Sequence, residues 1–287
     1  MDNLRGALLM TLSMAGFAFE DMFIKLTAGA MPTWQILAAM GIFGAPLFAV
    51  LTWAKGDPLF TRAYLTFPVF VRITGELIGR FGLITAIALV PLSTASAILQ
   101  ATPLAVALGA ALFYRDPVGW RRWLAIVIGF IGVLIVIRPG TEGFDARALF
   151  AVLAVIGLGS RDLVTRSIPR ETSSMQLSFI AFLSFFPSAL VLSVFSDQAM
   201  VVPDMQLFCL ILAMVLFGAL GYYLIVAAMR VGEVSFVTPF RYARILFAIV
   251  IGMIVFNETP DIWVVVGACV IVGSGIYSIW RERKRRI

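Results

Sequence analysis

The sequence predicts an all-α polytopic membrane protein whose ten transmembrane helices form two inverted five-helix repeats. Three observations lead to this fold class. The 287-residue chain is 61% hydrophobic and only 13% charged, with a mean hydropathy of +1.00, so its apolar surface is too large for a soluble core. The apolar runs are continuous, whereas the strands of a membrane β-barrel would alternate apolar and polar residues. The two halves of the chain also share an ordered set of residues.

Glycine, proline and charged residues divide the chain into apolar segments, each close to the ~20 residues that cross a bilayer as a helix. The third and fourth segments are separated only by Pro91, which marks a turn, since their combined length is too great for one helix. The first segment is interpreted as a retained span, because Glu20 and Asp21 interrupt it and no cleavage site follows. The ten predicted spans are 5–27, 33–53, 67–90, 92–113, 119–137, 146–168, 174–195, 206–229, 234–256 and 262–280.

Lysine and arginine lie mainly on one side of the predicted membrane, which sets the orientation. With the N-terminus in the cytoplasm, only Lys25, Arg138 and Arg147 fall outside. We therefore expect a bacterial-type inner membrane protein with both termini cytoplasmic. The basic tail, residues 281–287, is expected to contact anionic lipid rather than nucleic acid. The cytoplasmic set is Arg5, Lys55, Arg62, Arg115, Arg121, Arg122, Arg161, Arg166, Arg170, Arg230, Arg281, Arg283, Lys284, Arg285 and Arg286.

Residue types that serve most enzymes and metal sites are scarce. Histidine is absent, and the two cysteines, Cys209 and Cys269, lie inside apolar segments. The sequence therefore predicts no metal or other cofactor, and it argues against a membrane enzyme because no nucleophile–base pair is evident. No Walker A motif is present, so ATP-driven transport by this chain is not expected.

The two halves align when the sequence is shifted by 141 to 143 residues. Each half holds five spans, an odd number, so the second repeat (143–280) must enter the membrane upside down relative to the first (1–138). Inverted repeats are typical of secondary transporters, in which two equivalent halves open a central site to either face. The aligned pairs include Gly16 with Gly157, Asp21 with Asp162, Lys25 with Arg166, Gly79 with Gly221, and Gly109 with Gly252.

Residues 88–137 combine a helix of small residues with an internal proline, an acidic residue before a turn, and a last span containing glycine. These places are filled by Pro103, Asp116 and Gly132, and in the second half by Glu258 and Gly275. The pattern resembles the EamA-type repeat of the drug/metabolite transporter superfamily. In length and polar centre the chain is similar to YddG-type aromatic amino-acid exporters, which implies amino-acid export. The second half departs from the pattern at Pro239, Arg241 and Arg244, where a substrate would be recognised.

Three charges stand four residues apart in the third span, so they share one helix face. Arg72 is near the cytoplasmic end, and its position favours a side chain that snorkels to the interface. Glu76 and Arg80 lie deeper. One interpretation is a ladder in which Glu76 neutralises one or both arginines; the other is that the ladder lines a wet vestibule, where Arg80 holds a substrate carboxylate.

The ninth span carries two further arginines, Arg241 and Arg244, after a proline that is expected to kink the helix, Pro239. At least two of the four arginines in spans three and nine are expected to lack an acidic partner. Such an excess of positive charge would suit a substrate carboxylate. This expectation rests on placing the remaining acidic residues nearer the membrane edges: Glu20, Asp21 and Asp162.

Other polar residues are candidates for binding or gating. Gln100 can hydrogen-bond a substrate or a neighbouring helix, and Tyr222 and Tyr223 are candidates for an aromatic lining. Two charged stretches at opposite membrane edges are related by the repeat, and they form either alternating gates or ordinary interfacial ion pairs. They contain Glu20, Asp21 and Lys25 in the first span, and Asp162 and Arg166 in the sixth.

The leading hypothesis is a secondary transporter that exports a small amphiphilic metabolite, an aromatic or neutral amino acid, by alternating access around a central polar cavity. The expected partners are this small molecule and the lipid bilayer, and a monomer is compatible with the sequence. The alternatives are an exporter or importer of another metabolite or of a drug-like cation, a channel, and a membrane enzyme. The possible proton carriers are Glu20, Asp21, Glu76 and Asp162.

Overall fold

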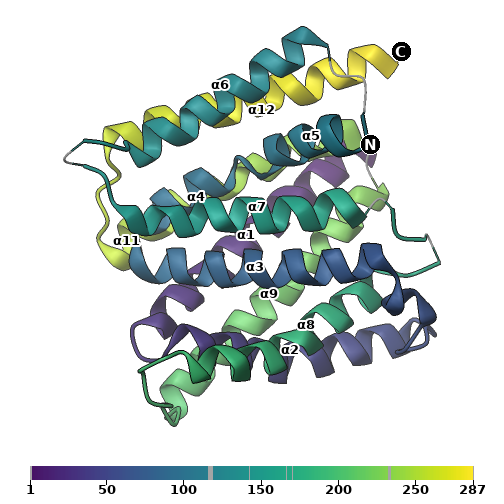
Figure 1. The fold of residues 1–287 in the computed structure, drawn as a ribbon, viewed down its shortest axis with the longest axis vertical. Helices are drawn as coiled ribbons and strands as arrows, with labels where there is room; N and C mark the ends of the chain where they lie inside the picture. Colours follow the sequence, from purple (N-terminus) through teal and green to yellow (C-terminus); the bar gives the residue numbers. More distant parts are fainter. Residues whose placement is uncertain are drawn as a thin grey trace.

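The computed structural model describes residues 2–115, 119–141, 143–165, 167–169, 171–231 and 234–286. In these ranges the regular elements are all helical (Figure 1). In chain order they are α1 (Asp2–Ala28), α2 (Thr33–Ala54), the 3₁₀ helix η1 (Arg62–Leu65), α3 (Phe67–Leu89), α4 (Leu92–Leu99), α5 (Thr102–Phe113), α6 (Trp120–Ile137), η2 (Ala146–Ala148), α7 (Leu149–Thr165), α8 (Ser174–Val194), α9 (Met205–Val231), α10 (Val234–Val237), η3 (Thr238–Tyr242), α11 (Ala243–Phe256) and α12 (Ile262–Arg286).

Ten membrane-spanning units can be recognised among the described residues, as the sequence predicts. Eight are long and apolar enough by composition alone, counting α4 with α5, and η3 with α11. The ninth is α3, a 23-residue helix of sufficient length that carries three charges. The tenth is α6, whose apolar part is Trp123–Ile137. The prediction of an all-helical polytopic membrane protein is confirmed.

The helices pair across the two halves in the way an inverted repeat requires. Helix α1 packs on α9, and α3 packs on α7. Because α7 is the counterpart of α1, and α9 of α3, these are two copies of one contact. Helices α2 and α8, and likewise α6 and α12, are counterparts that pack directly on each other (Figure 1). The pattern is that of two five-helix halves related by a pseudo-two-fold axis.

Glycines make the two equivalent crossings close. At the α1–α9 crossing, a Cβ on Gly16 would lie 3.2 Å from the Cα of Gly221. At the α3–α7 crossing, a Cβ on Gly157 would lie 2.6 Å from the Cα of Gly79. In lipid, where association depends on van der Waals packing, such small residues let helix backbones approach. Two of the glycine pairs that align between the repeats, Gly16 with Gly157 and Gly79 with Gly221, are therefore at these crossings of the two halves.

Two predicted spans, 92–113 and 234–256, are not continuous helices. The first is broken between α4 and α5 because Pro103 has no N–H for the preceding turn, and the hydroxyl of Thr102 donates to the carbonyl of Leu99 instead (2.6 Å). The second passes through η3, which contains Pro239, rather than a simple kink. The two breaks meet, since Gln100 Nε2 donates to the carbonyl oxygen of Tyr242 (2.9 Å).

Both chain ends lie at the same end of the bundle, as Figure 1 shows. We call this the terminal end, and the end that carries the loops after α1, α3, α6, α8 and α11 the far end. Helices α1 and α9, each 27 residues long, cross the bundle obliquely. Which end faces the cytoplasm stays a prediction from the distribution of basic residues.

The α3–α7 crossing gives a test of the fold. Replacing Gly157 by Ala places a methyl group against the backbone of Gly79 and Gly75, which cannot rotate away. We expect a loss of about 1–3 kcal/mol in the free energy of unfolding, as for other overpacked sites. Thermal unfolding of the detergent-purified protein, followed by circular dichroism, measures it.

The matched control is Gly273→Ala in α12, where a Cβ would meet no atom within 4 Å. This change should stabilise the protein by up to about 1 kcal/mol through helix propensity. Equal effects of the two substitutions would contradict the close crossing.

Candidate substrate cavity

A cavity of about 750 Å³ lies between the two halves, within the size range of small-molecule sites. Residues of both repeats line it, from α1, α3, α4, α5, α7, α8, α9, η3, α11 and α12. The lining runs from helix ends at the terminal end, including Thr165, Ser174 and Ile279, to Glu20 and Leu83 in the middle of the bundle. The described lining residues include none from the far-end loops. The cavity therefore occupies the terminal half of the protein.

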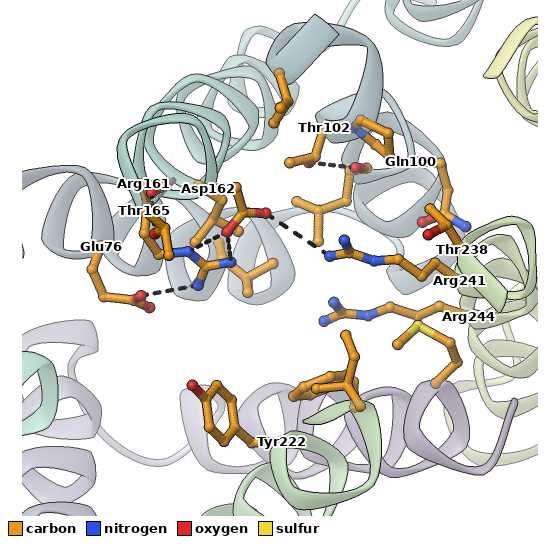
Figure 2. A pocket seen from close by; sticks show the side chains of 18 of the residues that line it. Glu76, Gln100, Thr102, Arg161, Asp162, Thr165, Tyr222, Thr238, Arg241 and Arg244 are labelled. Carbon is orange, nitrogen blue, oxygen red and sulfur yellow. Dashed lines mark hydrogen bonds and ion pairs between the residues drawn. The ribbon is translucent and has the colours of Figure 1, made fainter. Parts of the chain in front are cut away.

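Charged side chains dominate the polar part of the cavity wall, and most are paired. The lining contains three carboxylates and five arginines, and a fourth carboxylate, that of Asp21, lies directly behind one of the arginines. Figure 2 shows several of these groups pointing toward one another across the open space. The charged lining residues are Glu20, Glu76, Asp162, Arg72, Arg80, Arg161, Arg241 and Arg244.

Helix α1 supplies two buried carboxylates that hold arginines of other helices. Asp21, 1% exposed, binds Arg244 of α11 through both oxygens, at 2.7 Å each to Nη2 and with a further bond of 3.0 Å from Nε. Glu20, 2% exposed, accepts a hydrogen bond of 2.9 Å from Nη1 of Arg80 in α3. Bidentate, charge-assisted bonds of this kind are strong and fix orientation.

The expectation that Glu20 and Asp21 lie near a membrane edge is therefore wrong, and their role in gating stays a prediction. Helix α1 is about 40 Å long at 1.5 Å per residue, and it crosses the bundle obliquely. Glu20 and Asp21 therefore lie in the interior of the bundle, although their positions in the sequence suggest the edge of the membrane. There they neutralise Arg80 and Arg244.

A second chain of ion pairs starts from α3 and reaches the opposite repeat. Glu76 binds Nη1 of Arg161 (2.9 Å) and lies 3.8 Å from Nε of Arg80. Arg161 also binds Asp162 (2.7 Å), and Asp162 lies 3.9 Å from Nη2 of Arg241 (Figure 2). The interpretation that Glu76 neutralises an arginine of its own helix is thus supported for Arg80. The closest partner of Glu76, however, is Arg161 of the other repeat.

Sequence reasoning missed Arg161, which it counted as a cytoplasmic charge at the end of a span. The repeat alignment contained a usable signal, because Arg161 occupies the place that Glu20 has in the first half. A charge at that place in both repeats, with opposite signs, indicates a shared position in the cavity wall. Arg166, predicted as the counterpart of Lys25 in a gate, lies outside the described residues.

Arg72 does not snorkel to the interface as predicted. Its side chain lines the cavity, and the residue is only 7% exposed. Nη1 donates to the hydroxyl of Thr165 (2.9 Å), and Nε has no hydrogen-bond partner. The expectation that at least two of the four arginines in spans three and nine lack an acidic partner is also wrong. Of these four, Arg72 alone has no carboxylate of the described residues within 4.0 Å.

The two adjacent tyrosines of α9 have different environments. Tyr222 lines the cavity and donates to the carbonyl of Ser174 (3.2 Å). Tyr223 is 56% exposed and is not part of the lining, so its predicted place in an aromatic wall is wrong. With 3.6 residues per turn, neighbouring side chains diverge by about 100°, and here Tyr222 faces the cavity while Tyr223 points away from it. Gln100 lines the cavity and donates a hydrogen bond to Tyr242, in a neighbouring helix, which is one of its two predicted roles.

A separate cluster, Lys25–Glu258, lies toward the far end. Nζ of Lys25 binds Oε1 of Glu258 (2.7 Å) and the carbonyl of Val90 (2.8 Å). Oε1 of Glu258 also accepts from the backbone N–H of Leu92 (2.8 Å), and Oε2 accepts from Ser93 (3.4 Å). Lys25 thus pairs with Glu258 rather than with the nearby acids of α1, and the cluster ties α1 to the α3–α4 turn and to the segment after α11.

The two halves each match one known family. Residues 4–138 and 146–280 match the EamA-like transporter family. The chain belongs to this family. It is therefore a multi-pass membrane protein of the drug/metabolite transporter superfamily, and a transporter rather than an enzyme.

Three relatives illustrate the range of this EamA-like family. An S-adenosylmethionine uptake transporter of Rickettsia conorii is 25% identical, over 75% of this chain and 73% of its own. A riboflavin transporter of Rhizobium johnstonii is 25% identical, over 98% and 92%. A pseudopaline exporter of Pseudomonas aeruginosa is 22% identical, over 97% of both chains. These names differ from the aromatic amino-acid exporters suggested by the sequence, so that resemblance establishes the superfamily and not the substrate.

A solved crystal structure shares the fold at a TM-score of 0.59. It covers 96% of this chain and 98% of its own, with 17% sequence identity. At this identity the likeness concerns the fold alone, and it agrees with the ten-helix arrangement of the EamA-like transporter described above.

The bidentate pair of Asp21 and Arg244 yields a prediction about stability. Asp21→Asn leaves Arg244 buried without an opposite charge, which should cost about 3–5 kcal/mol of the free energy of unfolding. The double variant Asp21→Leu with Arg244→Met removes both charges and should recover most of the loss. Melting temperatures of the purified variants test both statements.

The control for this pair is Asp145→Asn, which breaks the exposed ion pair with Arg147. That change should leave the melting temperature nearly unchanged, because solvent screens the pair. A melting temperature of the double variant as low as that of Asp21→Asn would show that charge pairing is not what stabilises this contact.

Proposed function

We propose that this EamA-like transporter moves a small amphiphilic metabolite bearing a carboxylate, an amino acid or an amino-acid derivative, through the cavity between its halves. The observation that carries the proposal is the charge balance, five arginines against four carboxylates, around a space of about 750 Å³. A single excess positive charge suits one anionic group. Apolar side chains such as Phe17, Leu83 and Phe182 line the rest and suit an apolar body.

Some of the relatives support this class, and others point to a different one. S-Adenosylmethionine, named for the Rickettsia relative, is an amino-acid derivative. Riboflavin, named for others, lacks a carboxylate and serves as the competing hypothesis. Outward transport of an aromatic or neutral amino acid, the hypothesis drawn from the sequence, falls within the proposed class.

The transport cycle we propose is alternating access by two rocking halves, 1–138 and 143–280, in an inner membrane. The excess of lysine and arginine at the terminal end supports an orientation with that end in the cytoplasm and the tail 281–287 near anionic lipid. In that orientation the described state opens its cavity inward, and the Lys25–Glu258 cluster seals the outer side. Opening outward requires this cluster to separate.

Arg241 is the cavity arginine best suited to change partners during transport. Arg80 and Arg244 hold carboxylates at 2.9 Å and 2.7 Å, whereas Arg241 lies 3.9 Å from Asp162 and its side chain is 32% exposed. A substrate carboxylate can therefore approach Arg241 without breaking a close pair.

The test is an uptake panel in proteoliposomes. Radiolabelled phenylalanine, tryptophan, S-adenosylmethionine, riboflavin and a quaternary ammonium drug are offered to the wild-type protein. We expect saturable uptake of a carboxylate-bearing compound, and Arg241→Gln should raise its KM about tenfold, the value of one lost charge-assisted bond.

Arg147→Gln, at an exposed ion pair outside the cavity, is the matched control and should transport normally. Uptake confined to riboflavin or to the cationic drug would overturn the carboxylate class. Flux that does not saturate would identify a channel instead.

The Lys25–Glu258 cluster gives a separate prediction about the outer side. In a cysteine-free background (Cys209 and Cys269 replaced by Ala), Leu92→Cys provides a reporter that is buried beside the cluster. Lys25→Met should increase its labelling by a membrane-impermeant maleimide added from outside, because the seal is weakened. The labelling rate on intact cells is the measurement.

Arg138→Gln is the control for this prediction, since it breaks a half-exposed ion pair with Asp261 at the same end of the bundle. It should leave the labelling of Cys at position 92 unchanged. Equal labelling in the Lys25→Met variant and in its parent would refute the role of the cluster as a seal.

A further inference from the structure

Arg72 is a buried cation whose surroundings hold no carboxylate for it. The residue is 7% exposed in the cavity wall, and its only described hydrogen bond joins Nη1 to the neutral hydroxyl of Thr165 (2.9 Å). Thr165 in turn donates to the carbonyl of Arg161 (2.6 Å), so its oxygen is oriented to accept from Arg72. The Nε atom of Arg72 is buried and has no partner.

The nearest acid on the same helix face is already occupied. Glu76 follows Arg72 by one turn, but its Oε2 binds Arg161 (2.9 Å) and its Oε1 lies 3.8 Å from Arg80. The other carboxylates of the cavity are similarly held, Glu20 by Arg80 and Asp21 by Arg244. The single excess positive charge of the described cavity is therefore located at Arg72.

A buried charge without a partner is costly and is found where a ligand supplies the missing group. We propose that Arg72, positioned by Thr165, is the anion-binding site at the entrance of the cavity, where its guanidinium receives the carboxylate of the substrate before that group reaches Arg241. The guanidinium presents donors in the planar arrangement that matches a carboxylate. This inference rests on the proposed function, and it names the residue at which that function's anionic group is first held.

The position of Arg72 fits such a role. It stands near the beginning of α3, beside the end of α7 at the terminal end of the cavity, so an entering substrate meets it before the deeper pairs of Glu20 and Asp21. Tyr222 and Phe182 line the same cavity and offer aromatic surface to the remainder of the molecule.

The experiment measures ligand-induced shifts in melting temperature with benzoate, its neutral isostere benzamide, and inorganic phosphate, at constant pH and ionic strength. Benzoate should stabilise the wild-type protein more than benzamide and more than phosphate does. This extra shift in melting temperature with benzoate should disappear in Arg72→Met. It should shrink several-fold in Thr165→Val, which keeps the charge of Arg72 but removes the hydroxyl that positions it.

A second readout separates a binding role from a structural one. Without ligand, Arg72→Met should raise the melting temperature by about 2–4 °C, because an uncompensated buried charge is removed. Arg244→Met, which removes a paired arginine, should lower it. A merely structural Arg72 would behave like Arg244, so a lowered melting temperature in Arg72→Met overturns the proposal.

Five further outcomes are decisive. A benzoate excess that persists in Arg72→Met, or that is absent from the wild type, overturns the assignment, and a larger effect of phosphate overturns the carboxylate class. If the uptake panel succeeds while Arg72→Met transports with an unchanged KM, this inference fails and the proposed function stands. If benzoate depends on Arg72 but no carboxylate compound is transported, the site stands and the proposed function fails.

Discussion

Charged side chains inside a lipid-embedded bundle need partners, and this requirement determines how the centre of the protein is built. Two of the close pairs join opposite repeats, Asp21 with Arg244 and Glu76 with Arg161. Each pair therefore fixes one half against the other as well as satisfying a buried charge. Helix α3 tolerates its three charges because all three line the cavity rather than facing the lipid, and two of them, Glu76 and Arg80, are paired there.

The backbone of the protein is nearly symmetric, but its charges are not. The α1–α9 and α3–α7 crossings use equivalent glycines, so the halves can exchange conformations with similar packing. At the next turn the symmetry ends, because Glu20 in the first repeat corresponds to Arg161 in the second. A symmetric scaffold thus encloses an asymmetric cavity, in which recognition of a substrate can differ between the two walls.

Hydropathy and the repeat were sufficient to predict the fold, since both depend on composition and order along the chain. The partners in the site were not predictable in the same way, because they depend on the depth and rotation of each helix. The oblique path of α1 brings Glu20 and Asp21 into contact with Arg80 and Arg244, although their positions in the sequence suggest a different depth in the membrane. Tyr222 and Tyr223 differ only by rotation, and no composition rule distinguishes them.

Two of the cavity arginines, Arg72 and Arg241, are held less tightly than Arg80 and Arg244, which lie deeper. The pairs of Glu20 and Asp21 are close and buried, Arg241 is held loosely at 3.9 Å, and Arg72 at the entrance has no carboxylate. A substrate entering from the terminal end thus meets Arg72, which has no carboxylate, before it reaches the arginines that are paired with Glu20 and Asp21. If binding neutralises Arg72, the energetic reason for that entrance to stay hydrated is removed, and closure there becomes more favourable. The Lys25–Glu258 cluster at the far end is then the contact whose loss would complete the exchange of access.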